Sequence, residues 1–220
     1  ATLMLNDRLI PYIHDVFLLT RQHELNRKAR LYMRPSFAFA VKRLKRFFVN
    51  SEKTKQDLQQ FCQPDAQIIM LRPQVRNVFE LQHDEHRYAR IEPARLKLVM
   101  LGTVEPRKNY AAAVAILNEL RARSGSEVEL HVVGRLGWGP DANLLQNTPG
   151  VVCYGYLSAD EIRALISSAT FYLSTSHDEG LGLPLLELQY SGIAVVAAKI
   201  PVFAEVLGNS GLLIDTGDAA

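Results

Sequence analysis

Short apolar runs alternate along the chain with stretches that have the period of a helix. Several of the runs are rich in Val, Ile or aromatic residues, which favours strands. The expected strands are Ile10–His14, Phe47–Asn50, Gln67–Leu71, Leu96–Gly102, Val128–Gly134, Val151–Tyr154, Thr170–Ser174, Ile193–Ala198 and Gly211–Asp215. The expected helices include Ser51–Phe61, Tyr110–Arg123 and Ser158–Ser168, and the last opens with a capping-box pair, Ser158 and Glu161. This alternation predicts an α/β fold with a doubly wound parallel sheet covered on both faces.

The composition changes between Pro73 and Pro93, where the chain is polar, has Pro at both ends and shows little periodicity. We interpret residues 76–94 as an interdomain linker between residues 1–75 and 95–220. Only three expected strands precede it, too few for a complete doubly wound domain, and the chain begins without Met almost directly in a strand. We therefore expect a partial N-terminal domain and a complete or nearly complete C-terminal domain.

Net charge, cysteine spacing and hydropathy restrict which kinds of partner the protein binds and in which cellular compartment it lies. The net charge is only +2, so no global field favours nucleic acid as a partner. Cys62 and Cys153 stand in no ligand spacing, which fits reduced thiols better than a disulfide framework. No apolar run reaches the ~18 residues of a spanning helix, and the amino end has no signal-peptide pattern. We expect a cytoplasmic protein that at most binds a membrane surface.

The most specific motif is a pair of carboxylates, Glu179 and Glu187, which follow an expected strand. Pro184 suits the first turn of a helix, and Gly180 and Gly182 let backbone approach a ligand closely. The free N–H groups of such a helix favour a phosphate or a sugar oxygen. Glu179 is expected at the mouth of the loop and Glu187 in about the first helical turn, both at the carboxyl edge of the sheet. On spacing alone, a strand-loop-helix joint with two solvated Glu side chains remains equally open.

The segment from Glu179 to Glu187 resembles the E-x7-E signature of retaining glycosyltransferases of family 4. Four more landmarks follow the order of that family. They are Gly102–Asn109, similar to the donor-phosphate loop, Val132–Gly134, similar to the next strand end, and two later segments, Gly192–Ala197 and Glu205–Leu213. The resemblance covers most of residues 96–217. It implies the GT-B fold, in which two Rossmann-like domains face each other, with residues 1–75 as part of the acceptor domain and 95–220 as the donor-binding domain.

The resemblance also implies roles for single residues. Glu179 would bind hydroxyls of the transferred sugar and Glu187 the ribose, tasks that suit an acceptor-only carboxylate. Lys108 with its neighbour Arg107 would hold the diphosphate and stabilise its growing charge, so no metal or cofactor is required. The implied donor-binding residues are Gly102, Thr103, Arg107, Lys108, Gly134, Gly180, Leu181, Gly182, Leu183 and Glu187.

Two cations at the start of a helix could also be a solvated turn. Because a cation there is mildly unfavourable to the helix dipole, a bound anion explains Arg107 and Lys108 better. Many relatives carry a second basic residue directly after the glycine, where this chain has Thr103. Whether the diphosphate is held by two cations or three therefore stays open.

His14 ends the first expected strand and resembles the histidine that faces the donor sugar from the acceptor domain of this family. We include it as a candidate catalytic residue with Glu179 and Lys108. A core or capping role is the alternative for a lone His after an apolar run. Asn50–Glu52 resembles the turn into the last helix of that domain, and Ser51 is more simply an N-cap.

Two weaker signals remain. His83–His86 has residues that can bind metal but lacks the two-cluster spacing of a zinc site, so we assign no metal. Between Arg21 and Arg46 stand nine Lys or Arg residues against the single acid Glu24, interleaved with aromatic and aliphatic residues. This composition suits a surface that docks on anionic lipid at the inner face of the membrane, although a solvated helix face is the common explanation.

The expected activity is transfer of a sugar from a nucleotide diphosphate donor to a glycan or lipid-linked acceptor, with retained configuration. Gly102–Asn109 looks most like bacterial enzymes that build surface polysaccharides such as lipopolysaccharide, several of which use GDP-mannose. Two alternatives stay open: a module that binds nucleotide sugar without turnover, and a GT-B epimerase that acts on the nucleotide sugar itself.

Overall fold

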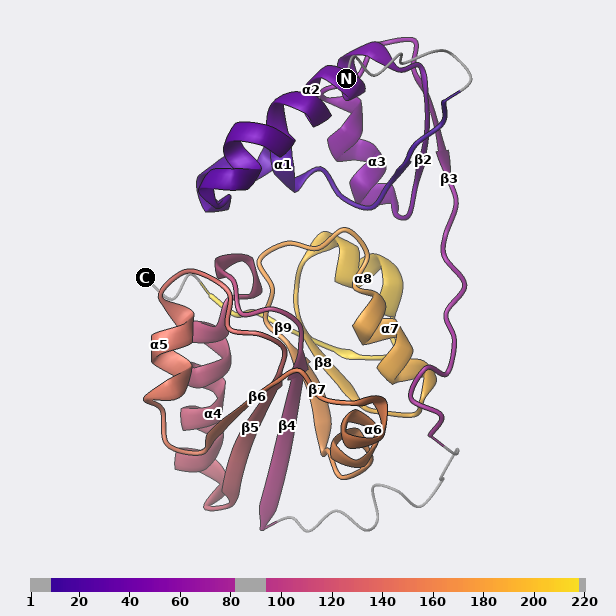
Figure 1. The fold of residues 1–220 in the computed structure, drawn as a ribbon. Coiled ribbons are helices and arrows are strands. Elements are labelled where there is room, and N and C mark those ends of the chain that lie inside the picture. The colour runs from indigo at the N-terminus through magenta and orange to yellow at the C-terminus, as the bar shows by residue number, and fades with distance from the viewer. Residues whose placement is uncertain (1–8, 82–93, 218–220) are drawn as a thin grey trace. The chain divides into compact units, whose positions relative to one another are not determined.

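The computed structural model describes residues 9–81 and 94–217 of the 220-residue chain. These residues form two compact units, both drawn in Figure 1. The first unit contains the residues up to Gln74 together with Glu179–Leu181, and the second contains Val75–Asp178 and the residues from Gly182 onward. The assignment of residues 76–94 as a linker stays a prediction, because most of that segment lies outside the described residues.

The first unit is built on a three-stranded parallel sheet in the order β1-β2-β3. Its strands and helices are β1 (Tyr12–Ile13), α1 (Phe17–Thr20), α2 (Arg34–Arg43), β2 (Arg46–Val49), α3 (Glu52–Gln59) and β3 (Gln67–Met70). A 3-10 turn, Gln22–Glu24, and a π-helical turn, Ala29–Met33, precede α2. The core contains Phe47 and Val49 of β2 packed with Val41 and Leu58 from the helices. Ser51 caps α3 as predicted, because its Oγ accepts a hydrogen bond from the Thr54 N–H at 3.0 Å.

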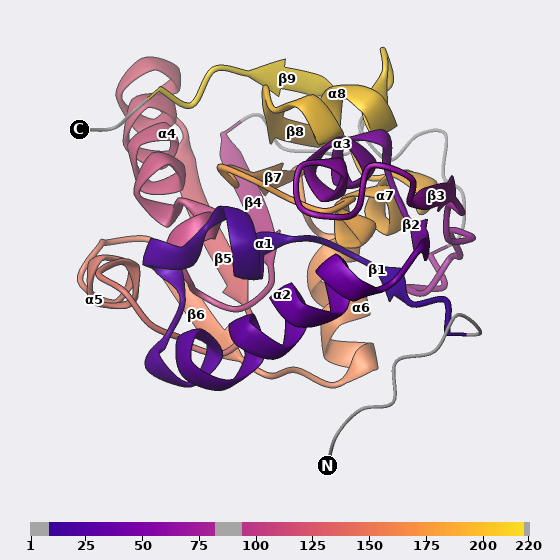
Figure 2. The same ribbon diagram turned by 90° about the horizontal axis from the view of Figure 1, so that it is seen from above.

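The second unit is a six-stranded parallel sheet in the order β6-β5-β4-β7-β8-β9. Its strands are β4 (Arg95–Leu101), β5 (Glu127–Val133), β6 (Val151–Gly155), β7 (Phe171–Ser174), β8 (Val195–Ala198) and β9 (Leu212–Ile214). Its helices are α4 (Tyr110–Ser124), α5 (Asp141–Gln146), α6 (Ala159–Ser167), α7 (Leu183–Tyr190) and α8 (Pro201–Leu207). Figures 1 and 2 show α4 and α5 on one face of this sheet and α6, α7 and α8 on the other.

Each face of the six-stranded sheet has its own apolar core. Along β4, Leu98 and Met100 pack with α4 and α5, while Val99 between them packs with α6, α7 and α8. This alternation follows from the two-residue period of a strand, and burial on both sides explains why the strands of this unit are almost continuously apolar. The prediction of an α/β fold with doubly covered parallel sheets is therefore confirmed.

The local predictions agree with the elements in most respects. Every expected strand range overlaps a strand, with bounds that differ by one or two residues. Helix α6 begins with the predicted capping box, in which the Ser158 hydroxyl accepts from the Glu161 N–H and the Glu161 carboxylate accepts from the Ser158 N–H. Glu187 differs: it is the fifth residue of α7 and lies in the second turn, because the helix begins at Leu183 and is capped by Gly182. Within the described part of the chain, no helix is long and apolar enough to cross a bilayer.

Candidate functional site

The strand order of the second unit reverses between β4 and β7. From β4 the chain continues to β5 and β6 on one side, and from β7 to β8 and β9 on the other. Such a reversal leaves a crevice at the carboxyl ends of the two central strands, where open α/β sheets bind ligands. The loop after β4 and the loop after β7 both begin at this place.

These two loops are joined by hydrogen bonds. Thr175, which is fully buried, donates its hydroxyl proton toward the carbonyls of Lys108 at 3.0 Å and Asn109 at 2.8 Å. The His177 N–H donates to the Arg107 carbonyl at 2.9 Å. The segment that contains Arg107 and Lys108 is therefore held by the loop after β7. We did not predict Thr175, although a polar residue directly after a buried strand is the signal that marks it.

Arg107 makes an ion pair within its own loop. Its guanidinium donates to the Glu105 carboxylate at 2.6 Å and to the Asp178 carbonyl at 2.8 Å, and both charged side chains are only 16% exposed. Glu105 was not among the predicted site residues. Its charge offsets that of Arg107, so the predicted contact of Arg107 with a diphosphate would compete with an existing, half-buried pair.

Lys108 lies against Gly102 at the end of β4. A Cβ added to Gly102 would be 3.3 Å from the Lys108 Cε and 3.5 Å from its Nζ. Gly134, at the end of β5, approaches the same backbone more closely, because its added Cβ would be 2.0 Å from the Gly102 carbonyl oxygen. Both glycines have positive φ, +131° and +146°, which side chains rarely allow. The loops after β4 and β5 therefore approach each other closely at these two glycines.

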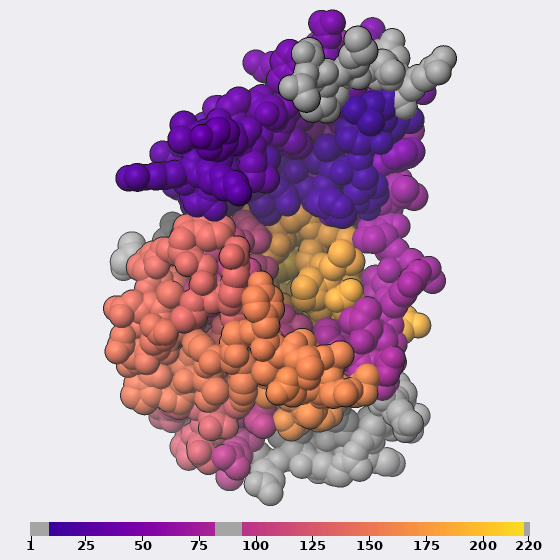
Figure 3. Space-filling model, in the orientation of Figure 1, coloured from indigo at the N-terminus to yellow at the C-terminus, as the bar shows by residue number. Residues whose placement is uncertain are grey.

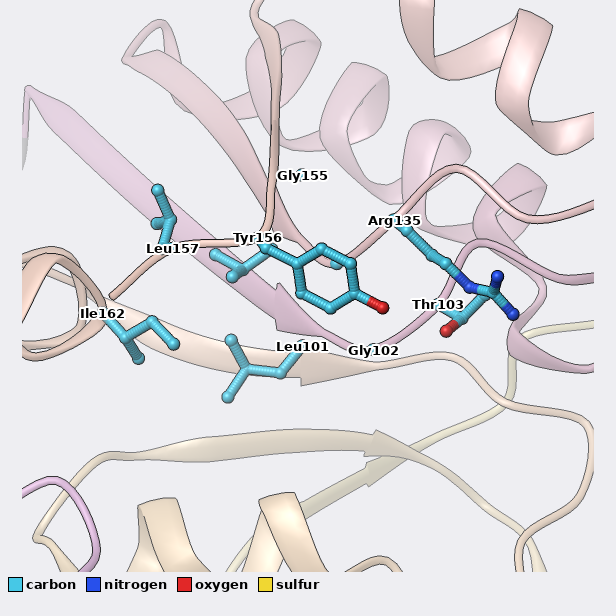
Figure 4. Close-up of a pocket in the computed structure, with 10 residues that line it drawn as sticks. Leu101, Gly102, Thr103, Arg135, Gly155, Tyr156, Leu157 and Ile162 are labelled. Carbon is cyan, nitrogen blue, oxygen red and sulfur yellow. The ribbon is translucent and has the colours of Figure 1, made fainter. Parts of the chain in front are cut away.

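A pocket of 260 Å³ opens at the carboxyl ends of β4, β5 and β6 (Figure 4). Its lining residues are Leu101, Gly102, Thr103, Val133, Gly134, Arg135, Gly155, Tyr156, Leu157 and Ile162. Figure 4 shows aliphatic side chains at one end and the side chains of Thr103 and Arg135 at the other, with the Tyr156 hydroxyl pointing toward them. The pocket therefore has an apolar end and a polar, positively charged end.

Sequence reasoning found part of this lining and missed the rest. Gly102, Thr103 and Gly134 were predicted donor-binding residues, whereas Arg135 and Tyr156 were not. Their position in the sequence could have identified Arg135 and Tyr156, because each follows the carboxyl end of β5 or β6 within two residues. In Figure 3, the salmon and orange segments that follow β5, which include α5, β6 and α6, form much of the visible surface of the second unit.

The start of α4 is capped by two side chains. Asn109, in the left-handed region at φ 51°, accepts from the Ala112 N–H at 3.3 Å. Asp141 is buried and accepts from the Tyr110 N–H at 3.1 Å, and burial raises the pKa of its carboxyl group. Two N–H groups at the start of α4 are therefore already satisfied by side chains of the protein.

The second carboxylate of the predicted motif lies on α7. Gly182 caps this helix with φ 86°, and Leu183 and Pro184 form its first turn. Glu187 is half-buried, and burial raises the pKa of its carboxyl group. Glu187 does not line the 260 Å³ pocket. A ligand that fills the pocket and also contacts Glu187 would therefore have to extend beyond the pocket.

The remaining predicted residues belong to the first unit. Within it, the Gly180 carbonyl accepts hydrogen bonds from the hydroxyls of Ser51 at 2.6 Å and Thr54 at 3.1 Å. His14 is exposed directly after β1, with its ring centroid 4.8 Å from that of Tyr12. The remaining residues of the 179–181 segment are half-buried Glu179 and buried Leu181. The catalytic roles predicted for His14 and Glu179 stay predictions.

Within residues 9–81 and 94–217, no cluster of three or more His, Cys, Asp or Glu side chains is arranged to hold a metal ion. The segment His83–His86, considered above for metal binding, lies outside the described residues.

Residues 95–220, more than half of the chain, match the family described as glycosyl transferases group 1. Among characterised proteins, O-antigen chain mannosyltransferase B of Escherichia coli is 31% identical over 123 residues, or 54% of this chain. The serotype-specific mannosyltransferase WbdA of E. coli is 32% identical over 114 residues, or 49% of this chain. The matched parts cover 32% of the first relative and 14% of the second, so each match spans only a minor part of the relative's own length.

Solved structures with the same fold have low sequence identity. Sucrose-phosphate synthase from Thermosynechococcus elongatus aligns over 98% of this chain and 56% of its own, with a TM-score of 0.73 and 16% identity. WaaG, a glycosyltransferase involved in lipopolysaccharide biosynthesis, aligns over 94% of this chain and 61% of its own, with a TM-score of 0.70 and 20% identity. At these identities the likeness establishes the fold.

Proposed function

Because the chain belongs to the glycosyl transferases of group 1, we propose that the protein transfers a sugar from a nucleotide diphosphate donor to a glycan or lipid-linked acceptor. The reaction retains the anomeric configuration. In it, the bond between the sugar C1 and the diphosphate oxygen breaks, the acceptor oxygen bonds to C1, and the leaving phosphate takes the acceptor proton. Lys108 stabilises the charge that develops on the leaving oxygen.

The observation that supports donor binding is the position of Lys108 beside Gly102, which lines the pocket at the ends of β4, β5 and β6. The apolar end, with Leu157 and Ile162, suits a nucleoside, and the polar end suits phosphates. Small-molecule sites typically have about 300–1,000 Å³. A 260 Å³ pocket therefore accommodates part of a nucleotide sugar, and the remainder extends toward the loop after β7.

The remaining donor contacts rest on the E-x7-E motif. In the proposal, Glu187 accepts hydrogen bonds from the ribose hydroxyls and Glu179 from hydroxyls of the transferred sugar, since an ionised carboxylate takes two neighbouring donors. Backbone of Gly180, Leu181, Gly182 and Leu183 borders the sugar and phosphates. His14 faces the sugar from the acceptor side. No metal takes part, because Lys108 and neighbouring donors supply the positive charge.

For the donor we propose mannose as the sugar, with GDP as the nucleotide because Gly102–Asn109 resembles bacterial enzymes of which several use GDP-mannose. The O-antigen chain mannosyltransferases B of E. coli and RfbU of Salmonella typhimurium, the latter 39% identical over 62 residues, favour mannose. Uridine is the alternative base, since HepE of Anabaena, which has the same fold, is described in complex with UDP and glucose. With this donor, the product of the proposed reaction is a mannosylated surface polysaccharide.

The acceptor side of the proposal includes a membrane surface. Three consecutive apolar residues, Leu31, Tyr32 and Met33, are 66%, 71% and 54% exposed, and Phe39 on α2 is 61% exposed. They lie within the basic segment Arg21–Arg46, where apolar and cationic side chains together suit the headgroup region of anionic lipid. In this proposal the segment holds the enzyme at the inner face of the cytoplasmic membrane, where a lipid-linked acceptor would be presented.

The proposal is tested by a thermal-shift panel of GDP, UDP, ADP and their sugar conjugates, each with and without EDTA. A ligand that binds only the folded chain stabilises it by ~2.7 kcal/mol at a concentration 100 times Kd. We expect a guanosine or uridine diphosphate to raise the melting temperature, with EDTA causing no change. No shift with any nucleotide would contradict donor binding, and a shift abolished by EDTA and restored by a divalent ion would contradict metal independence.

Turnover is tested with the full-length enzyme. Nucleotide released from the sugar donor only when acceptor is present would support transfer and exclude the epimerase. Conversion of the nucleotide sugar into its epimer without acceptor would support the epimerase instead. Binding without either reaction would support a module that only binds the donor.

A further inference from the structure

Three cationic side chains lie in the two loops that follow β4 and β5, and the structure gives them different environments. Arg107 is bonded to Glu105 and to the Asp178 carbonyl. Lys108 lies against Gly102. Arg135 lines the pocket beside Gly102 and Thr103. Of the two arginines, only Arg135 therefore presents its charge to the pocket.

The backbone at Arg135 is fixed by the loop after β4. The Val104 N–H donates to the Arg135 carbonyl at 3.0 Å, and the Gly137 N–H donates back to the Val104 carbonyl at 3.0 Å. Gly137 also leaves no room for a side chain, because an added Cβ would be 2.4 Å from the Val104 carbonyl oxygen. These contacts hold the backbone of Arg135 beside the loop after β4.

The guanidinium group of Arg135 is available to an anion. The residue is exposed, and among the described residues its side chain makes no hydrogen bond or ion pair. Figure 4 shows the guanidinium at the same end of the pocket as the Thr103 hydroxyl. A planar group with five donors next to a hydroxyl donor matches a phosphate that carries two charged oxygens.

Resting on the donor binding proposed above, we propose that Arg135, with Lys108, binds the diphosphate of the donor and that Arg107 is a positioning residue. Arg107 holds Glu105 and the loop after β7 in place, and its ion pair persists when the donor binds. Thr103 donates a hydrogen bond to a phosphate oxygen without adding charge. The diphosphate is thus held by two cations, which come from two different loops.

The test is calorimetric titration of the whole chain with GDP, GMP and guanosine, and in parallel with UDP, UMP and uridine, using competition for weak ligands. The variants are Arg135→Gln, Arg135→Lys and Arg107→Gln. Arg123→Gln is the matched control, because Arg123 is a highly exposed arginine in the last turn of α4 that pairs with Glu119 of the same helix. The measured quantity is the ratio of diphosphate affinity to nucleoside affinity.

We expect Arg135→Gln to lower this ratio about tenfold, because a charge-assisted hydrogen bond is lost from an exposed site. Arg135→Lys should recover part of the loss by keeping the charge. Arg107→Gln should lower the melting temperature and change both affinities by the same factor, which leaves the ratio near the wild-type value. The control should leave the ratio and both affinities unchanged.

If the affinity ratio of Arg135→Gln equals that of the wild type, Arg135 does not bind the diphosphate. If the ratio falls in Arg107→Gln instead, Arg107 rather than Arg135 is the second cation that binds the diphosphate. A nucleoside affinity that falls as much as the diphosphate affinity in Arg135→Gln would also contradict a phosphate contact. If the wild-type chain binds none of the nucleotides, donor binding itself fails, and that outcome is distinct from the other three.

Discussion

We expect the ionised side chain of Glu187 to lower the free energy of unfolding of the unliganded protein. Burial raises the pKa of its carboxyl group, so the folded state holds the proton more tightly than the unfolded state does. The protonated carboxyl group therefore makes its whole contribution to the free energy of unfolding below the unfolded pKa of about 4.3. This contribution is lost as the pH rises through the raised pKa of the folded state. At neutral pH the ionised side chain destabilises the fold.

Glu187→Gln should therefore stabilise the unliganded chain at pH 7.5. The gain is expected to stay under about 1 kcal/mol because the side chain is partly exposed, and it should disappear near pH 4. Urea unfolding at both pH values measures it. Equal stability of variant and wild type at pH 7.5 would show that ionised Glu187 carries no cost in the folded protein.

The same carboxylate is expected to contribute to donor affinity. Glu187→Ala removes hydrogen bonds from two ribose hydroxyls to a charged group, which should weaken nucleoside diphosphate binding by about 1.5–3 kcal/mol. Calorimetry with the nucleoside diphosphate measures the change. Unchanged affinity would remove Glu187 from the ribose site, and any structural loss is detected separately by the melting temperature.

Lys108 should act on the reaction step more than on donor affinity. The leaving oxygen carries more negative charge at the transition state than in the intact donor, so a cation beside it favours the transition state. Lys108→Ala in the full-length enzyme should cost up to ~2.7–4 kcal/mol, mainly in kcat, with Arg135 compensating in part. A rise in KM alone, with kcat unchanged, would make Lys108 a uniform binding contact.

At the scale of elements, the close approach of the loops after β4 and β5 depends on Gly134. An added Cβ there would be 2.0 Å from the Gly102 carbonyl oxygen, whereas one at Gly125 would meet no atom within 4 Å, although both residues have positive φ. Gly134→Ala should therefore lower stability more than Gly125→Ala, by at least about 1 kcal/mol, and should also weaken nucleotide binding. Thermal unfolding and calorimetry of the two variants provide the comparison, and equal losses in both would contradict a structural requirement at Gly134.

The strands could be predicted from the sequence because each is a short run rich in apolar residues. Most of them are buried on one or both faces, whereas Ile69 and Met70 of β3 are exposed. Two helices of the second unit were not among the predictions: α5 has six residues and α8 has seven, too few to show a helical period. The π-helical turn Ala29–Met33 was also not predicted, because its exposed apolar residues do not follow the spacing of a buried face.

The site residues that belong to a family motif could be predicted, whereas those that depend on the direction of a side chain could not. Gly102 and Gly134 were identified from the resemblance of their segments to the family, and the structure adds that a side chain at Gly134 would collide with the Gly102 carbonyl. Arg107 and Arg135 have the same chemistry, and the sequence could not show that Glu105 would hold the first while the second faces the pocket. That distinction depends on side-chain directions, and for Arg107 also on a contact with the Asp178 carbonyl in a loop far away in the chain.

At the scale of the whole molecule, the basic segment Arg21–Arg46 predicts attachment to anionic vesicles. Each Lys or Arg near the surface contributes ~1 kcal/mol, so the chain should sediment with anionic but not neutral vesicles and should be released in high salt. Replacing Leu31 and Phe39 together by Ser should weaken sedimentation without changing the charge. Equal sedimentation with both kinds of vesicle would favour a solvated helix face.

The central claim is that the carboxyl ends of β4, β5 and β6 bind the nucleoside diphosphate of a sugar donor. It is tested most directly by a crystal structure of the chain with the nucleoside diphosphate that gives the largest thermal shift. The account predicts the base beside Tyr156 and Ile162 and the diphosphate beside Gly102, within reach of Lys108. A nucleotide bound elsewhere on the chain, with these residues uncontacted, would contradict it.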